Sequence, residues 1–126
     1  MWMTFLQVGL GGAIGAMLRF GVGLMVVRQT GTAGFPLGIL PVNVIGSFLM
    51  GVVVVAAFHR DLQHLNPFLM SGILGGFTTF SAFSLEAFTL YERGEMVQAG
   101  VYVLLSVVLS IAALAAGVWL ARMLWA

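Results

Sequence analysis

The segment with the clearest potential for chemistry runs from Gly72 to Glu86, where adjacent glycines precede threonines, phenylalanines and serines. Glycine and threonine are poor helix formers, so Gly75-Gly76-Phe77-Thr78-Thr79 predicts an interruption in an otherwise helical stretch. A helix that breaks inside a membrane frees backbone carbonyl groups, which is tolerated only within protein or beside a cavity. Broken helices near the middle of a bilayer are a recurrent way to build ion sites.

Two phenylalanines directly follow this predicted break. Phe80 and Phe83 are three residues apart and therefore share a helix face. A phenylalanine stripe is normally packing material. Beside a helix break and several hydroxyl groups, the pair also suits an anion, because the rim of an aromatic ring carries partial positive charge.

Three isolated polar residues in apolar surroundings each allow more than one interpretation. Asn43 is suited either to a hydrogen bond between helices or to donating its amide to an ion. Arg19 either extends to the membrane surface or places a fixed positive charge facing the protein interior near an anion path. Glu86 is a helix-end residue near water, an ion-pair partner for Arg19, or part of a vestibule.

Two further stripes have helical spacing. Tyr102, Ser106 and Ser110 follow one another at intervals of four residues, which suits tight packing, bonds back to the helix, or the wetting of a pore. Gly11 and Gly15 form a small-residue face that lets two helix backbones approach closely. We interpret the glycine face as packing.

The elements that position these residues are predicted by composition. The chain has 126 residues, of which 61% are hydrophobic and 7% charged, against about 25% charged in a soluble domain. A surface with so few charges requires lipid as its solvent, which excludes a soluble fold. We predict a single all-α membrane domain, 1–126, with four transmembrane helices and the third helix broken. The expected spans are approximately 3–27, 37–58, 67–91 and 97–121.

The charges do not select one orientation in the membrane. Four spans place Arg60 and Arg122 on one side and Arg28 and Arg93 on the other, and orientation follows the asymmetry of such residues. We therefore expect insertion in both orientations and an antiparallel homodimer. Alternatively, the α-amino group or another partner fixes one orientation. The chain has no lysine and no basic run, which argues against nucleic acid as a partner.

Three blocks, in this order, resemble the Fluc (CrcB) family of fluoride channels. They are Gly11 to Phe20, Val42 to Ser47, and Gly75 to Ser84 followed by Glu86. The third block is highly specific, and the length and the number of spans match over the whole chain. The resemblance implies a passive, fluoride-selective channel in the cell inner (plasma) membrane. It further implies an antiparallel, dual-topology homodimer surrounded by lipid, with two fluoride pathways along the subunit interface.

The resemblance also assigns roles to individual residues. Asn43, Phe80 and Phe83 would line the fluoride pathway, with Ser81 in the same region and Ser110 in a polar track on the last helix. A structural sodium ion at the dimer centre would be held by the backbone carbonyls of Gly75 and Thr78. Arg19 and Glu86 are the candidate electrostatic residues.

This chain departs from the family pattern at three positions. Ile39, Ala82 and Leu114 stand where the family often has threonine, so the hydroxyl track is thinner and the conduction rate is open.

Other functions fit the sequence less well. A small dual-topology multidrug transporter needs a carboxylate in its first span, where this chain has Arg19. A membrane scaffold without transport would need no particular role for the two phenylalanines. An enzyme is not expected, because His59, Asp61 and His64 are loop residues and too few for a metal site.

Overall fold

The computed structural model describes residues 1–31 and 37–125, and four of its helical segments are long and apolar enough to cross a bilayer. They are Trp2–Thr30 (α1), Ile39–His59 (α2), the interrupted segment Gln63–Glu92, and Met96–Leu124 (α5). No strand occurs within the described ranges. The prediction of an all-α membrane fold with four long helices is therefore confirmed.

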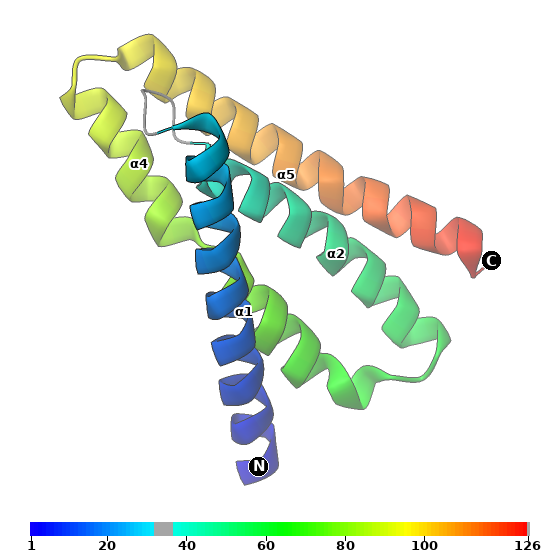
Figure 1. Ribbon diagram of the computed structural model, residues 1–126. Helices are drawn as coiled ribbons and strands as arrows, with labels where there is room; N and C mark the ends of the chain where they lie inside the picture. The colour runs from blue at the N-terminus through cyan, green and yellow to red at the C-terminus, as the bar shows by residue number, and fades with distance from the viewer. Residues whose placement is uncertain (32–36, 126) are drawn as a thin grey trace.

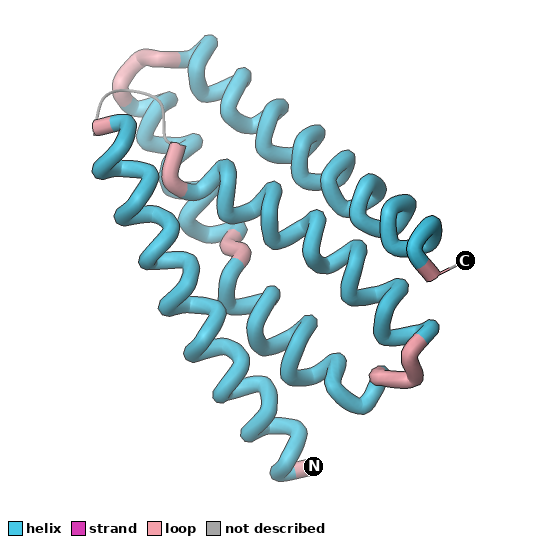
Figure 2. Tube along the Cα trace, turned by 45° about the vertical axis from the view of Figure 1, so that its right-hand side comes forward, coloured by secondary structure: helices cyan, strands magenta, loops and turns pink. Residues whose placement is uncertain are grey.

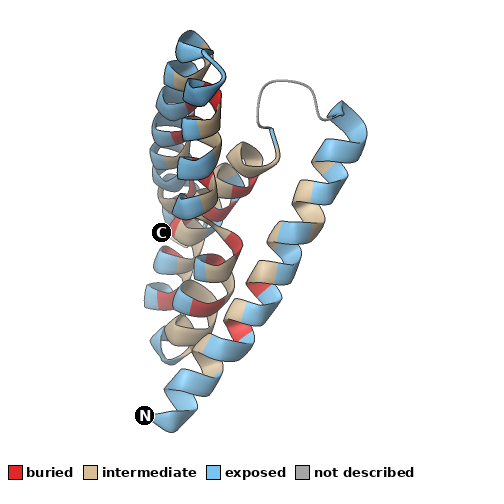
Figure 3. Cartoon of the chain, turned by 90° about the vertical axis from the view of Figure 1, so that its left-hand side faces the viewer, coloured by how far each residue is buried: buried red, intermediate tan, exposed pale blue. Residues whose placement is uncertain are grey.

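Large apolar side chains cover the outside of these helices. Leu10 in α1, Leu104 in α5 and Trp119 in α5 are each more than 60% exposed. Figure 3 shows α1 exposed along most of its length, with its few buried positions on the side that faces the rest of the bundle. Such a surface is compatible with lipid and not with water.

The third span is interrupted, as predicted, by two residues with extended backbone. A short 3₁₀ turn, Gln63–Leu65 (η1), leads into a π-helix, Pro67–Leu74 (η2), and one α-turn, Gly75–Phe77 (α3). Thr78 and Thr79 are extended, and helix Phe80–Glu92 (α4) completes the span. The break therefore lies at the threonines, whereas the glycines remain helical.

The threonine side chains explain where the helix stops and restarts. The Thr78 hydroxyl donates to the Leu74 carbonyl at 2.9 Å, which closes the last turn before the break. The Thr79 hydroxyl accepts the Ala82 amide at 3.2 Å and so caps the start of α4. Threonine is a preferred capping residue because its oxygen satisfies an amide that has no helical partner.

The helices pack in two groups that the third span joins. Figures 1 and 2 show α2 and α5 side by side, while α1 runs along the first half of the third span. Between α2 and α5, Gly51 lies against the Leu114 carbonyl and Gly117 against the Phe48 carbonyl. Small residues allow this close approach of helix backbones, which is a usual source of cohesion between helices in lipid.

A second seam of glycines docks α1 on the third span. Gly11 and Gly15 are buried, and a side-chain carbon added at Gly15 would meet the Ile73 carbonyl and the Phe77 amide. Gly12, by contrast, has open space where its side chain would be. The predicted small-residue face is thus a packing surface.

This difference predicts opposite effects for the same substitution at neighbouring positions. Gly15→Ala should lower stability by about 1–3 kcal/mol, since the added methyl forces two backbones apart. Gly12→Ala should leave stability unchanged or raise it by up to about 1 kcal/mol, because alanine favours helix more than glycine does. Thermal unfolding of the two variants in detergent measures both effects. Equal unfolding temperatures for the two variants would contradict the close packing of α1 against the third span.

Candidate functional site

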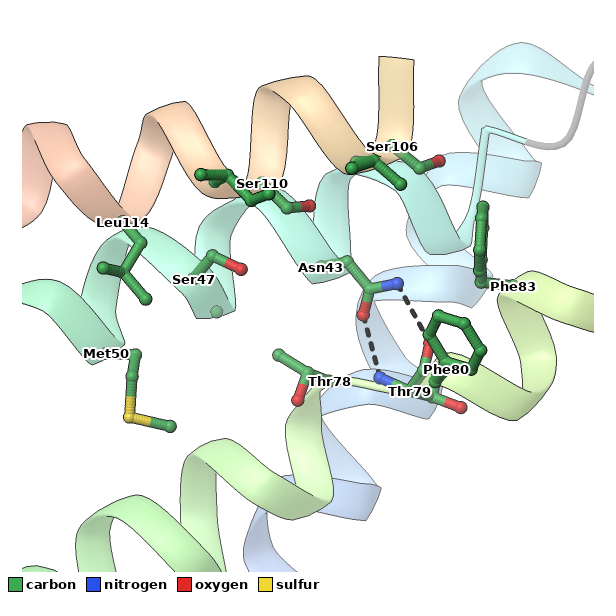
Figure 4. Close-up of a pocket in the computed structure, with 13 residues that line it drawn as sticks. Asn43, Ser47, Met50, Thr78, Thr79, Phe80, Phe83, Ser106, Ser110 and Leu114 are labelled. Atoms are coloured by element: carbon green, nitrogen blue, oxygen red, sulfur yellow. Dashed lines mark hydrogen bonds between the residues drawn. The ribbon is translucent and has the colours of Figure 1, made fainter. Parts of the chain in front are cut away.

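The side chain of Asn43 on α2 bridges the break in the third span. Its Nδ2 donates to the Thr79 carbonyl at 3.0 Å, and its Oδ1 accepts the Thr79 amide at 2.8 Å (Figure 4). The asparagine amide therefore pairs with both backbone groups of one unwound residue. Because a primary amide has two N–H donors, one donor of Asn43 remains after this pairing.

The same hydrogen bonds leave two backbone carbonyls without their helical partners. In a continuous helix the Thr79 amide would bind the Gly75 carbonyl, but here it binds Asn43. Likewise the Ala82 amide, which would bind the Thr78 carbonyl, donates to the Thr79 hydroxyl instead. The carbonyl oxygens of Gly75 and Thr78 have thus lost the amides that would bind them in a continuous helix.

A pocket of about 390 Å³ lies beside the break, between α2, α5 and the start of α4 (Figure 4). Its walls are mostly apolar, with hydroxyl and amide groups at intervals. The residues that line it are Asn43, Gly46, Ser47, Met50, Thr78, Thr79, Phe80, Phe83, Ser106, Val107, Ser110, Ile111 and Leu114.

The two phenylalanines meet at one end of this pocket. The ring centroids of Phe80 and Phe83 are 5.3 Å apart and the rings are tilted by 58°. Phe83 is only 7% exposed and packs against Tyr102 with a centroid distance of 5.4 Å. Phe80 is 77% exposed, so no residue in the described part of the chain covers most of its ring.

The predicted pathway residues are brought together only in part. Asn43, Phe80, Phe83 and Ser110 all line the pocket, whereas Ser81 does not. The Ser81 hydroxyl instead lies 3.3 Å from the Thr79 hydroxyl on the exposed side of α4. The roles themselves remain predictions.

Sequence reasoning did not assign Ser47 and Thr79 to the site, although both line the pocket. Ser47 lies four residues after Asn43 on α2, so its helical spacing was a usable signal. Nothing in the spacing indicates that Thr79 pairs with Asn43.

The two candidate electrostatic residues lie in a separate cavity of about 490 Å³ beside the start of α2. Arg19 and Glu86 both line it, together with Ile39. The Glu86 carboxylate accepts a hydrogen bond from the Tyr102 hydroxyl at 2.7 Å. The Arg19 Nε is buried and has no hydrogen-bond partner among residues 1–31 and 37–125. The partner of Glu86 is therefore Tyr102, which the sequence interpretation did not include.

Comparison with known proteins identifies the family of this chain. The family model described as "CrcB-like protein, Camphor Resistance (CrcB)" matches residues 6–118. The chain belongs to the CrcB family. This confirms the resemblance inferred from the sequence blocks.

Named relatives of this CrcB chain share most of its length. A protein of Ruegeria sp. (strain TM1040), named fluoride-specific ion channel FluC, is 60% identical over 122 residues, which is 97% of each chain. A protein of the same name from Roseobacter denitrificans is 59% identical over 120 residues, 94% of this chain and 95% of its own. Another, from Paracoccus denitrificans, is 55% identical over 123 residues and 98% of each chain. Family and helices together indicate a multi-pass membrane protein.

Proposed function

We propose that this CrcB protein is a passive fluoride channel that lets fluoride leave the cell. The observation that carries the proposal is the pocket at the break, where Phe80, Phe83 and Asn43 converge. Relatives up to 60% identical over 97% of the chain, named fluoride-specific ion channels, support fluoride as the ion.

The pocket offers an anion several weak contacts and no single strong one. Taking a bare anion out of water costs several kcal/mol. One hydrogen bond to a charged group returns about 1.5–3 kcal/mol. The remaining N–H of Asn43 and the rims of two phenylalanines therefore cannot offset full dehydration. Hydroxyls of Ser47 and Ser110, which line the same pocket, let the ion keep part of its water.

Weak binding at several places is also what conduction requires, because an ion must leave as readily as it enters. Leu114 lines the pocket beyond Ser110 and carries no hydroxyl. We expect fluoride to pass Leu114 more slowly, because the track of hydroxyl groups lacks one there.

Exposed residues on both sides of the break support assembly as a homodimer. Non-helical backbone is not stable against lipid tails, and Gly75 and Phe80, which lie in the helical turns on either side of the extended residues, are exposed in the single chain. A second copy that packs against this face would cover both. The balanced arginines support an antiparallel arrangement, which would place a pathway on each side of the two-fold axis.

The freed carbonyls support a sodium ion in that dimer. Backbone oxygens at unwound helix segments are suitable ligands for sodium, and the Gly75 and Thr78 carbonyls have lost their helical donors. Held there, a cation would link the two chains and contribute positive charge near the anion path. Native mass spectrometry in sodium, and with sodium replaced by a large organic cation, tests the dimer and the role of sodium in it. A single-chain mass in sodium contradicts the dimer.

The experiment that tests the function is halide efflux from liposomes. Vesicles that contain the purified protein and are loaded with fluoride should release it within seconds to minutes, whereas vesicles loaded with chloride should retain it. A fluoride electrode and a chloride electrode measure the two rates. Retention of fluoride by the unmodified protein ends the proposal, and equal release of both ions limits it to an unselective anion channel.

The alternatives have less support. Family membership favours a channel over a multidrug transporter, and an ion channel requires no catalytic residue. Uptake of a lipophilic cation driven by a proton gradient would support a multidrug transporter instead.

A further inference from the structure

A third cavity, of about 510 Å³, lies at the end of the bundle where α2 and α5 finish. Its walls combine apolar side chains with polar ones from the ends of the helices and the segment that follows α2. The lining residues are Val54, Val55, Ala57, Phe58, His59, Gln63, Asn66, Met70 and Arg122.

This cavity continues the line of the pocket beside the break. On α2, Val54 follows Met50 by one turn, and Met50 is the last α2 residue of the pocket. On α5, Arg122 follows Leu114 by about two turns, roughly 12 Å along the helix, and Leu114 closes the pocket on that helix. The two helices pack against each other between these points, at Gly51 and Gly117. The pocket and the cavity therefore lie in series along one helix pair.

The polar end of the cavity is suited to holding water. Oδ1 of Asn66 is buried and has no hydrogen-bond partner in the part of the chain that the structure describes. A buried acceptor of this kind is normally satisfied by water, which needs two to four polar neighbours. His59, Gln63 and Arg122 line the same cavity and carry polar groups that a water molecule could bind.

The charged part of the lining of this cavity is positive. Arg122 contributes a fixed positive charge, and none of the described residues that line the cavity is acidic. Positive charge in a recess with low-dielectric walls raises the local concentration of anions.

We infer that this cavity is the anion-gathering mouth of the conduction path, with Arg122 as the residue that attracts hydrated small anions. The inference rests on the proposed channel function and adds a binding site to it. Arg122 acts on the concentration of ions at the entrance and does not contact the phenylalanine pair.

The test is the ionic-strength dependence of fluoride efflux. At about 10 mM salt the screening length is about 30 Å, and at about 1 M it is about 3 Å. Arg122→Gln should lower efflux about threefold to tenfold at the low salt concentration, and the variant should approach the unmodified protein at the high one. Arg122→Lys keeps the charge and should retain both the rate and its salt dependence.

Arg60→Gln is the matched control, because Arg60 is exposed at the same end of the bundle but does not line the cavity. Its efflux should fall less than that of Arg122→Gln. If Arg122→Gln and the unmodified protein release fluoride equally fast at low salt, the cavity does not gather anions, although the proposed channel function still stands. A loss that persists at high salt also overturns it, and indicates a bound lipid or a damaged assembly at this site. Absence of efflux from the unmodified protein contradicts the channel itself.

Discussion

Asn43→Asp should reduce fluoride efflux at least about 100-fold. The carboxylate can still accept the Thr79 amide, but it has no N–H to donate to the Thr79 carbonyl, and its charge repels both that carbonyl and an incoming anion. The variant also lacks the N–H that would bind fluoride, and losing a hydrogen bond to a charged group costs about 1.5–3 kcal/mol. Each 1.4 kcal/mol changes an equilibrium constant by about a factor of ten. Repulsion of the anion adds to this. Efflux from fluoride-loaded liposomes measures the effect.

A matched control distinguishes the effect of the position of Asn43 from the effect of replacing an amide with an acid. Gln98→Glu makes the same amide-to-acid replacement near the start of α5, at a residue that does not line the pocket, and should leave efflux close to that of the unmodified protein. Asn43→Asp with efflux near normal would show that neither the remaining N–H nor the pairing with Thr79 matters for conduction.

The pairing also gives Asn43 a positioning role that can be measured without fluoride. In Asn43→Ala, hydrogen exchange at the Thr79 amide should accelerate, because that amide loses its acceptor. If Asn43 served only as an ion ligand, the exchange rate of this amide in fluoride-free buffer would not change.

Phe80→Ile should reduce fluoride efflux about tenfold, which corresponds to the upper range of an aromatic contact. Isoleucine preserves apolar bulk but lacks the positive ring edge. Because Phe80 is 77% exposed, the replacement leaves no cavity in the core of the chain, and folding should be retained. Efflux and size-exclusion chromatography together measure function and assembly.

Phe88→Ile is the control for this change. Phe88 lies two turns further along α4, is 57% exposed and stacks on Tyr91, away from the pocket. Its efflux should match that of the unmodified protein. If Phe80→Ile conducts as well as Phe88→Ile, the phenylalanine pair is only packing, as in a scaffold without transport.

The elements of the fold were predictable because they depend on local composition. Four long apolar stretches with few charges predict four spans, and glycines followed by threonines disfavour a continuous helix. The exact break was not predictable in the same way. It depends on the hydroxyls of Thr78 and Thr79 finding Leu74 and Ala82, a choice that the glycines alone do not determine.

The contacts that complete the site depend on residues far apart in the chain. Asn43 and Thr79 are separated by 36 positions, and Tyr102 and Glu86 by 16, so no periodicity connects them. The position of Ser81 shows a related difficulty. Two extended residues before α4 reset the phase of the helix, so counting from the first half of the span does not show which side chains face the pocket.

The order of packing along the chain has a consequence for biosynthesis. α1 finds its glycine-lined partner only after residues 67–77 have been made, and α2 finds its partner only after α5 has emerged. Each of the first two spans is therefore made before its main packing partner, and α1 carries Arg19 at that stage, where an arginine at mid-membrane costs about 2.5–3.5 kcal/mol. Cohesion between α2 and its main partner is thus acquired only once α5 has been made, and a ribosome-stalled chain without α5 would leave the small residues of α2 facing lipid.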